Sequence, residues 1–266
     1  MDKIFLSIDE LIYCFYSEGL FEQGSALKQV YFGDLDDEKM DLLLQITCRS
    51  LLAKKLVNYK NHKFTLSDHL ASVIATLNYS EQTIKASRHA DNGNGEEQIS
   101  FHFGEKGIIQ HVLMFDEMVH EFSFVTIQQV YKKIGEYYRV GKISKENEDA
   151  FKLTQMEFEQ LLLALTDNRS KFERPPLEGA KKRFNEVLEE TNGLLNTLLF
   201  LEFNENKEPY ATNVIMFTNS KSNNWMIEKR DDNFIVQPCN ENSIHLLLEK
   251  NITAYKEKKE GLAHGK

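Results

Sequence analysis

Two kinds of hydrophobic pattern alternate along the chain. Apolar residues at every third or fourth position predict helices, and apolar residues at every second position predict strands. The predicted helices cover residues 8–18, 38–56, 67–78, 126–138, 154–165, 178–203 and 240–255. The predicted strands cover residues 59–66, 81–88, 99–103, 108–115, 118–125, 211–218, 224–230 and 234–237. Because short turns join successive strands, we expect antiparallel meanders in an α+β fold.

One helix start occurs twice in the sequence. Ser7 with Glu10, and Thr154 with Glu157, have the spacing of a capping box. In this motif the hydroxyl accepts a hydrogen bond from the backbone of the first turn, and the Glu reaches back to the capping residue's own N–H. Each of the two motifs is followed by helices, a strand meander and a closing helix.

This repeated order predicts two related halves packed as one pseudo-two-fold domain. The halves are residues 1–140 and 151–266, and a charged linker, residues 141–150, joins them. An accidental repetition of an α+β order is the alternative. The first half also contains a strand and a helix within residues 59–88 that have no evident counterpart in the second half.

Composition and charge narrow the class of partner. The chain has 266 residues, of which 41% are hydrophobic, enough for a folded core. The net charge of −9 opposes general nucleic-acid binding, because phosphate contacts need a basic surface, so we expect protein partners. Cys14, Cys48 and Cys239 form no Cys-x-x-Cys pair and are expected to be buried thiols of a cytoplasmic protein. No apolar run approaches ~18 residues, so we expect neither a signal peptide nor membrane insertion.

Residues suited to catalysis or metal binding lack the spacing that such chemistry needs. His102, His111 and His120 fall on successive predicted strands, but we expect the hairpin registers to keep the three apart. No Gly-x-Ser-x-Gly motif occurs, and a strand follows the Gly104–Gly107 turn, whereas a phosphate loop leads into a helix. We therefore expect no catalytic residue, no metal site and no cofactor.

Two apolar features are candidates for a partner surface. The predicted helix 178–203 is apolar on more than one side, which fits either a fully buried helix or a groove that accepts a helix tip from a partner. Its candidate contact residues are Leu194, Leu198, Leu199 and Phe200. Trp225, the single tryptophan, is either a core residue or an exposed binding anchor.

Three stretches of the sequence carry a family resemblance. They are the opening Leu6–Leu11 (LSIDEL), the meander Phe101–Val125 and the aromatic strand Asn224–Glu228, which a turn joins to Phe234–Val236. This pattern covers almost the whole chain and resembles the EspG-type chaperones of type VII secretion and their Firmicutes relatives of the EsaE type. The Lys- and Asn-rich, Pro-poor composition suits a low-GC Gram-positive relative.

The resemblance implies a central antiparallel sheet flanked by two helical bundles. It also implies a cytosolic chaperone or adaptor that binds the apolar tip of a helical secreted substrate and delivers it for export. The binding side would comprise the loop 89–96 and a bundle drawn from residues 161–165 and 178–203. The expected contact residues in the loop are Asp91, Asn92 and Asn94.

Two other functions are compatible with the sequence. Residues 36–88 also fit a winged-helix transcriptional regulator with a local basic patch. The patch would contain Lys54, Lys55, Lys60, Lys63, Lys85 and Arg88. DNA binding that weakens steeply with salt would favour this function. An enzyme of unrecognised class is the third possibility, and a deep polar pocket with perturbed pKa values would favour it.

Overall fold

The computed structural model describes residues 3–90, 95–140, 150–166, 177–220 and 223–264. The helices within these ranges are α1 (Ile8–Ser17), α2 (Phe21–Phe32), α3 (Asp37–Ala53), α4 (Asp68–Asn78), α5 (Ile127–Tyr137), α6 (Gln155–Thr166), α7 (Gly179–Glu190) and α8 (Glu241–His264). The strands are β1 (Ile4–Ser7), β2 (Val57–Lys60), β3 (Lys63–Leu66), β4 (Gln82–His89), β5 (Glu96–Gly104), β6 (Gly107–Met114), β7 (Val119–Val125), β8 (Phe151–Thr154), β9 (Asn196–Phe203), β10 (Pro209–Asn219), β11 (Asn224–Arg230) and β12 (Asn233–Pro238).

Ten of the described strands form an antiparallel sheet in the order β1-β7-β6-β5-β4-β9-β10-β11-β12-β8, and β2 and β3 form a separate hairpin. Counted inward from either edge, the strands follow the same arrangement: β1-β7-β6-β5-β4 from one edge and β8-β12-β11-β10-β9 from the other. A four-residue strand before a capped helix, β1 or β8, pairs with the last strand of a meander, β7 or β12. The predicted α+β fold with a central antiparallel sheet is therefore confirmed. The strand predicted at residues 81–88 is β4. Its counterpart in the other half of the strand order is β9.

The chain divides into two compact units that interleave in sequence. The first unit contains Met1–Thr83 and Ile99–Thr126, and the second contains Ile84–Gln98 and Ile127–Lys266. These units do not coincide with the predicted halves, because β4 and α5 belong largely or wholly to the second unit. The predicted linker lies almost entirely outside the described residues.

Both predicted capping boxes are present, and each follows directly on a strand that the sequence analysis missed. The Ser7 N–H donates to Glu10 Oε2 (3.0 Å), and the Thr154 N–H donates to Glu157 Oε2 (2.7 Å). The capping residue is the last residue of β1 in one case and of β8 in the other. The motif therefore builds a strand-to-helix corner, and strands of four residues are too short to give a clear alternating pattern.

The core of the first unit forms where α1, α3 and α4 meet β1, β6 and β7. Leu6, Leu11, Leu51, Leu70 and Phe122 are all buried there. The helix α2, which the sequence analysis did not predict, buries only Gly24. A Cβ at that position would lie 3.1 Å from the Tyr16 ring, so the missing side chain lets α2 approach α1 closely.

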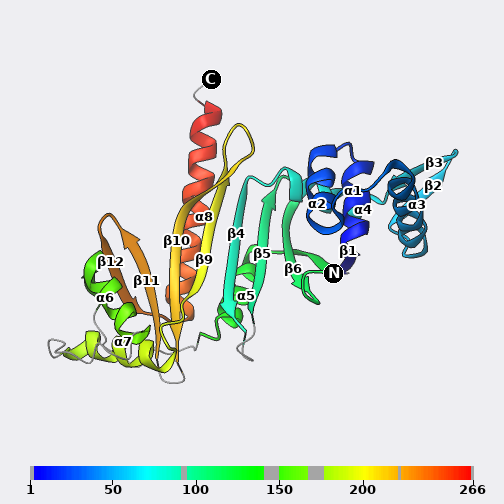
Figure 1. The fold of residues 1–266 in the computed structure, drawn as a ribbon. Coiled ribbons are helices and arrows are strands. Elements are labelled where there is room, and N and C mark those ends of the chain that lie inside the picture. The colour runs from blue at the N-terminus through cyan, green and yellow to red at the C-terminus, as the bar shows by residue number, and fades with distance from the viewer. Residues whose placement is uncertain (1–2, 91–94, 141–149, 167–176, 221–222, 265–266) are drawn as a thin grey trace. The chain divides into compact units, whose positions relative to one another are not determined.

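The core of the second unit is aromatic. Trp225 is fully buried, with the rings of Phe151 and Phe184 edge-on to it at 5.8 and 5.7 Å. α6 and α7 cover this side of β11 and β12, and α8 runs along β9 and β10 (Figure 1). Asn213 on β10 donates a hydrogen bond to Asn251 on α8. Trp225 is thus a core residue, and its prediction as an exposed partner-binding anchor is wrong.

The predicted long helix 178–203 is also wrong. α7 ends at Glu190, and Asn192 and Gly193 then take left-handed conformations, with φ of 51° and 71°. The Gly193 N–H donates to Leu188 O (2.8 Å), which closes the helix end. The following residues form β9, which buries one face and half-buries the other, so its central residues Leu198–Leu201 are all apolar. An Asn-Gly pair before such a run indicates a helix end and a buried strand.

The residues 59–66, predicted as one strand, form part of the hairpin of β2 and β3. Asn61 and His62 both have positive φ, as the tight turn of a two-residue hairpin requires.

None of the helices in the described part of the chain combines the length and apolarity that a bilayer crossing requires.

The three strand histidines meet in the first unit, against expectation. Ser100 pairs with His111, and His111 pairs with Phe122, so His102, His111 and His120 all project from one face of the sheet. His111 Nε2 lies 2.9 Å from His120 Nδ1, and the rings of His102 and His111 are 5.8 Å apart. The prediction that the hairpin registers keep the three apart is therefore wrong, because these residues are diagonal neighbours across adjacent strands.

Candidate functional site

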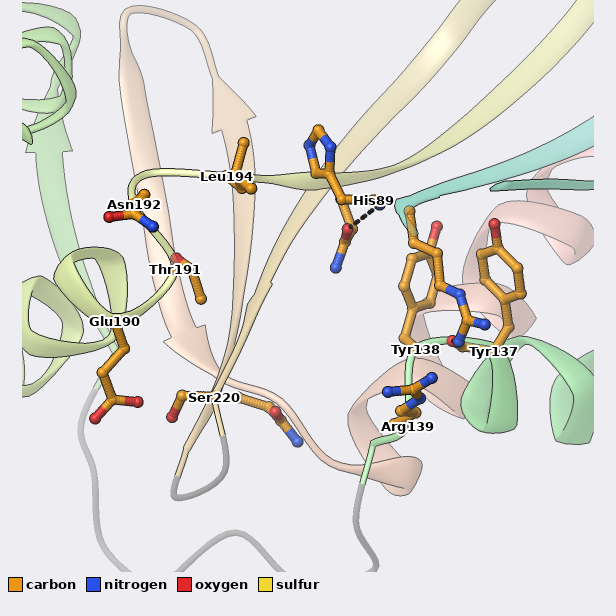
Figure 2. A pocket seen from close by; sticks show the side chains of 12 residues that line it. His89, Tyr137, Tyr138, Arg139, Glu190, Thr191, Asn192, Leu194 and Ser220 are labelled. Atoms are coloured by element: carbon orange, nitrogen blue, oxygen red, sulfur yellow. Dashed lines mark hydrogen bonds between the residues drawn. The ribbon is translucent and has the colours of Figure 1, made fainter. Parts of the chain in front are cut away.

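A pocket of about 800 Å³ opens in the second unit, and we call it the tyrosine pocket. Its walls come from the end of β4, the end of α5, the turn between α7 and β9, and the facing ends of β10 and β11 (Figure 2). The lining residues are Arg88, His89, Tyr137, Tyr138, Arg139, Glu190, Thr191, Asn192, Leu194, Asn196, Ser220 and Asn224.

Arg88 and two tyrosines build one wall of the tyrosine pocket. The Arg88 guanidinium donates to Glu97 Oε2 at 2.8 and 2.6 Å, donates to the Tyr137 carbonyl, and lies 4.7 Å from the centre of the Tyr137 ring. The Tyr137 hydroxyl donates to the Glu97 carbonyl. Cation–π contact and paired hydrogen bonds fix these side chains in place, so this wall is formed before any ligand binds.

Tyr138 connects the wall to the sheet. Its ring stacks on Phe217 at 4.6 Å, and its hydroxyl donates to the Thr197 carbonyl at the start of β9. Burial raises the pKa of both Tyr137 and Tyr138 above the ordinary tyrosine value. Both rings are therefore neutral at physiological pH and serve as packing and hydrogen-bonding groups.

The opposite wall is the turn between α7 and β9. Figure 2 shows Glu190, Thr191 and Asn192 on this side, with Leu194 at the start of the following chain segment. Thr191 Oγ1 donates to Val187 O (3.0 Å), and a Cβ on Gly193 would lie 3.2 Å from Leu165 Cδ1 of α6. Helix closure and close packing on α6 thus fix the path of the turn.

The pocket also borders the loop that follows β4. The His89 N–H donates to Asn196 Oδ1 (3.1 Å), the contact marked in Figure 2, and the Ala90 N–H donates to Gly95 O (3.2 Å). The ends of the predicted binding loop 89–96 therefore lie at the pocket. Residues 91–94 lie outside the described residues, and with them the predicted contact residues Asp91, Asn92 and Asn94.

The tyrosine pocket contains groups suited to recognising a ligand. Within the described residues, no three His, Cys, Asp or Glu side chains gather in an arrangement that could hold a metal ion. Burial raises the pKa of the Cys239 thiol to about 12, and it also raises the pKa of Cys14, so neither sulfur is an activated nucleophile. The pocket offers amide, hydroxyl, aromatic and aliphatic groups for recognition.

The four predicted contact residues near Gly193 differ in their position and exposure. Leu194 lines the tyrosine pocket and is 48% exposed. Leu198 and Phe200 are fully buried on one face of β9, and Leu199 is half-buried on the other. Their predicted role as one helical face that binds a partner is therefore wrong, because alternation along a strand separates neighbouring side chains. Leu194 alone of the four lies at the pocket.

Most of the polar lining of the pocket was not predicted from the sequence. Arg88 ends a correctly predicted strand, His89 begins the predicted binding loop 89–96, and Tyr137 and Tyr138 end a correctly predicted helix, but no local pattern shows that these ends converge. The signal available for the opposite wall was Asn192-Gly193, which marks the end of a helix and thus a surface turn.

Comparison with known proteins places the chain in a family. A family model described as "Uncharacterised protein YfjC" matches residues 3–248. The chain belongs to the YfjC family. It is 33% identical over 257 residues to "Uncharacterized protein YfjC" of Bacillus subtilis (strain 168), a match that covers 94% of this chain and all of that protein.

The fold of this YfjC family member has a counterpart among solved structures. A chain of "Structure of the Mycobacterium tuberculosis type VII secretion system chaperone EspG5 in complex with PE25-PPE41 dimer" superposes on it with a TM-score of 0.60. The alignment covers 94% of this chain and 96% of that chain, at 6% sequence identity. The EspG-like fold that the sequence resemblance implied is therefore confirmed.

Proposed function

We propose that the protein is a cytosolic chaperone or adaptor that binds the tip of a helical secreted protein and delivers it to a type VII secretion system. The observation that carries this proposal is the fold similarity to EspG5, a chaperone described in complex with the PE25-PPE41 dimer, over 94% of the chain. A binding function also agrees with the chemistry of the tyrosine pocket, which we propose as the contact site.

A helix tip has two properties that a binding site must match. It presents apolar side chains, and it leaves up to four backbone N–H or C=O groups without partners inside the helix. Leu194 and Tyr137 offer apolar surface to the side chains. Asn192, Ser220 and Asn224 carry amide and hydroxyl groups, which can donate to or accept from the unpaired backbone groups.

The geometry gives no specific support to the transcription alternative. Two members of the predicted basic patch are bound to carboxylates, Lys54 to Glu10 at 2.6 Å and Arg88 to Glu97 at 2.6 Å. The patch is also divided between the two units, because Lys85 and Arg88 belong to the second. Cations that are already neutralised contribute little to phosphate binding.

A pull-down with a matched control tests the proposal. The bait is this protein, and the candidates are helical proteins secreted by the type VII system of the same organism. Leu194→Asp places a charge in the tyrosine pocket and should weaken capture at least tenfold, because burying an unpaired carboxylate is costly. Leu246→Asp makes the same change at a 61% exposed position on α8 and should leave capture unchanged.

Two outcomes count against the proposal. If no secreted helical protein is captured by the unmodified chain, the chaperone function fails. If capture occurs but Leu194→Asp and Leu246→Asp behave alike, the function stands and the tyrosine pocket is the wrong contact site.

A further inference from the structure

A second pocket, of about 810 Å³, lies in the first unit, and three lysines are among the residues that line it. We call it the lysine pocket, and define it by Lys3, Lys54, Lys55, Leu56, His69 and Phe124. It forms where the end of α3 meets the start of α4, a corner closed by the hydrogen bond from Ser67 N–H to Leu56 O (2.8 Å). No acidic residue of the described chain lines it.

Two of the lysines form ion pairs with buried carboxylates. Lys54 Nζ lies 2.6 Å from Glu10 Oε2, and Lys3 Nζ lies 2.8 Å from Glu121 Oε1. Both glutamates are buried, whereas the two lysine side chains stay about half-exposed. The Lys54 ammonium also donates to the Phe5 carbonyl (3.3 Å). The ion pairs therefore fix the two lysines in place, and their half-exposed side chains line the pocket.

Lys55 has no such counter-charge among the described residues. It occupies a left-handed position, with φ of 59°, just after the end of α3. The hydrogen bonds from Leu56 N–H to Leu51 O (2.9 Å) and from Lys55 N–H to Leu52 O (3.0 Å) form a Schellman motif, in which glycine is preferred at this position. A side chain there costs about 1 kcal/mol, so the local conformation does not explain a lysine.

The charges and the walls together define a ligand class. Three lysines line the pocket, and two of them are paired with buried carboxylates, which leaves the positive charge of Lys55 for a ligand to balance. The remaining wall is apolar and aromatic, with the His69 ring 5.1 Å from the ring of Phe124 and with Leu56 beside them. We propose that the lysine pocket binds an organic anion, a carboxylate or phosphate carried on an aromatic or aliphatic body.

This site is independent of the proposed chaperone function, because the lysine pocket and the tyrosine pocket lie in different units. Such an organic anion could be the free carboxyl terminus of a peptide or a small phosphate ester. The probes represent both: N-acetyl-phenylalanine with its neutral amide, and phenyl phosphate with neutral phenol.

Titration of the full chain, followed by NMR signals of the His69 and Phe124 rings, tests the proposal. We expect the two anions to shift these signals with saturation and the neutral analogues to leave them unchanged. Lys55→Gly should weaken anion binding at least fivefold. Lys207→Gly, which removes the same side chain from a left-handed position in the second unit (φ 63°), should not change it.

The Lys55→Gly variant separates binding from folding, because glycine is preferred at this position and the melting temperature should not fall. Stronger binding of N-acetyl-phenylalanine assigns the site to peptide carboxylates, and stronger binding of phenyl phosphate assigns it to phosphate esters. Neutral analogues that bind as well as the anions, or a Lys55→Gly variant that binds anions as the unmodified protein does, would overturn the proposal.

Discussion

The two strand-to-helix corners have the same capping motif and differ in what surrounds it. At the first, Glu10 is 1% exposed and accepts hydrogen bonds from Ser50 and Lys54 as well as from the capping residue. At the second, Glu157 is exposed, and its nearest cation, Lys181, is 3.7 Å away. The motif therefore sets the local backbone in both places, while more distant residues decide whether the carboxylate also joins separate elements.

Removing the two glutamates should give the largest difference between the corners. Glu10→Ala removes a buried carboxylate that accepts hydrogen bonds from Ser50, from Lys54 and from the capping N–H, and it should lower the free energy of unfolding by about 3 kcal/mol. Glu157→Ala removes an exposed cap and should cost about 1 kcal/mol or less. Urea unfolding of both variants measures the difference. Equal losses would show that the burial of Glu10 adds nothing to its capping role.

Acid should act mainly on the first unit, because its sheet face carries the three histidines where the second unit has Trp225 and phenylalanines. Burial lowers the pKa of His102 to about 4 and also lowers the pKa values of His111 and His120. The unfolded chain then binds more protons below pH 6.5, so stability should fall as pH drops from 6.5 toward 4. His102 alone should account for about 2 kcal/mol between pH 7 and pH 5.

The control for this acid effect is His102→Gln, which keeps a hydrogen-bonding group for Thr83 and removes the titration. Chemical unfolding between pH 7 and pH 5 should show a flatter pH dependence in the variant. The carboxylates titrate in both proteins, so the difference isolates His102. An unchanged slope would mean that the folded state accommodates the protonated imidazole.

The smallest effect should come from Lys181, the cation of the second corner. Its ion pair with Glu157 is long and solvent-exposed, and such pairs contribute little. Lys181→Ala should change the free energy of unfolding by less than about 0.5 kcal/mol. Thermal melts at low and high salt check this. A larger, salt-sensitive loss of stability would mean that the ion pair of the second corner stabilises the fold, as that of the first corner does.

The sequence predicted most of the fold where a local rule decides the structure. Capping boxes, tight turns and alternating strands lie where the residues indicated, because each depends on neighbours within a few positions. The largely apolar stretch 194–201 was misread because such a sequence fits a buried helix and a buried strand equally well, and only the neighbouring strands β4 and β10 make it a strand.

The candidate site was harder to predict than the fold. Leu194 was found for the wrong reason, as part of a helix. Arg88 was predicted only as part of a basic patch, and Tyr137 was not predicted as a site residue. Their contact joins the end of a strand to the end of a helix about fifty residues later in the sequence. A single sequence carries no periodic signal for such convergence. The histidine stack was excluded for a related reason, since diagonal neighbours across strands depend on register.

The pairing of β1 has a consequence for synthesis of the chain. Ile4 leaves the ribosome long before Phe122, its partner on the sheet. β1 therefore stays unpaired until β7 has been synthesised. Only then can the strand-to-helix corner at Ser7 pack into the first unit. Pairing across so long a stretch of chain makes folding slow. Nascent chains that stop before residue 119 should expose the apolar face of β1 and be open to capture by general folding factors.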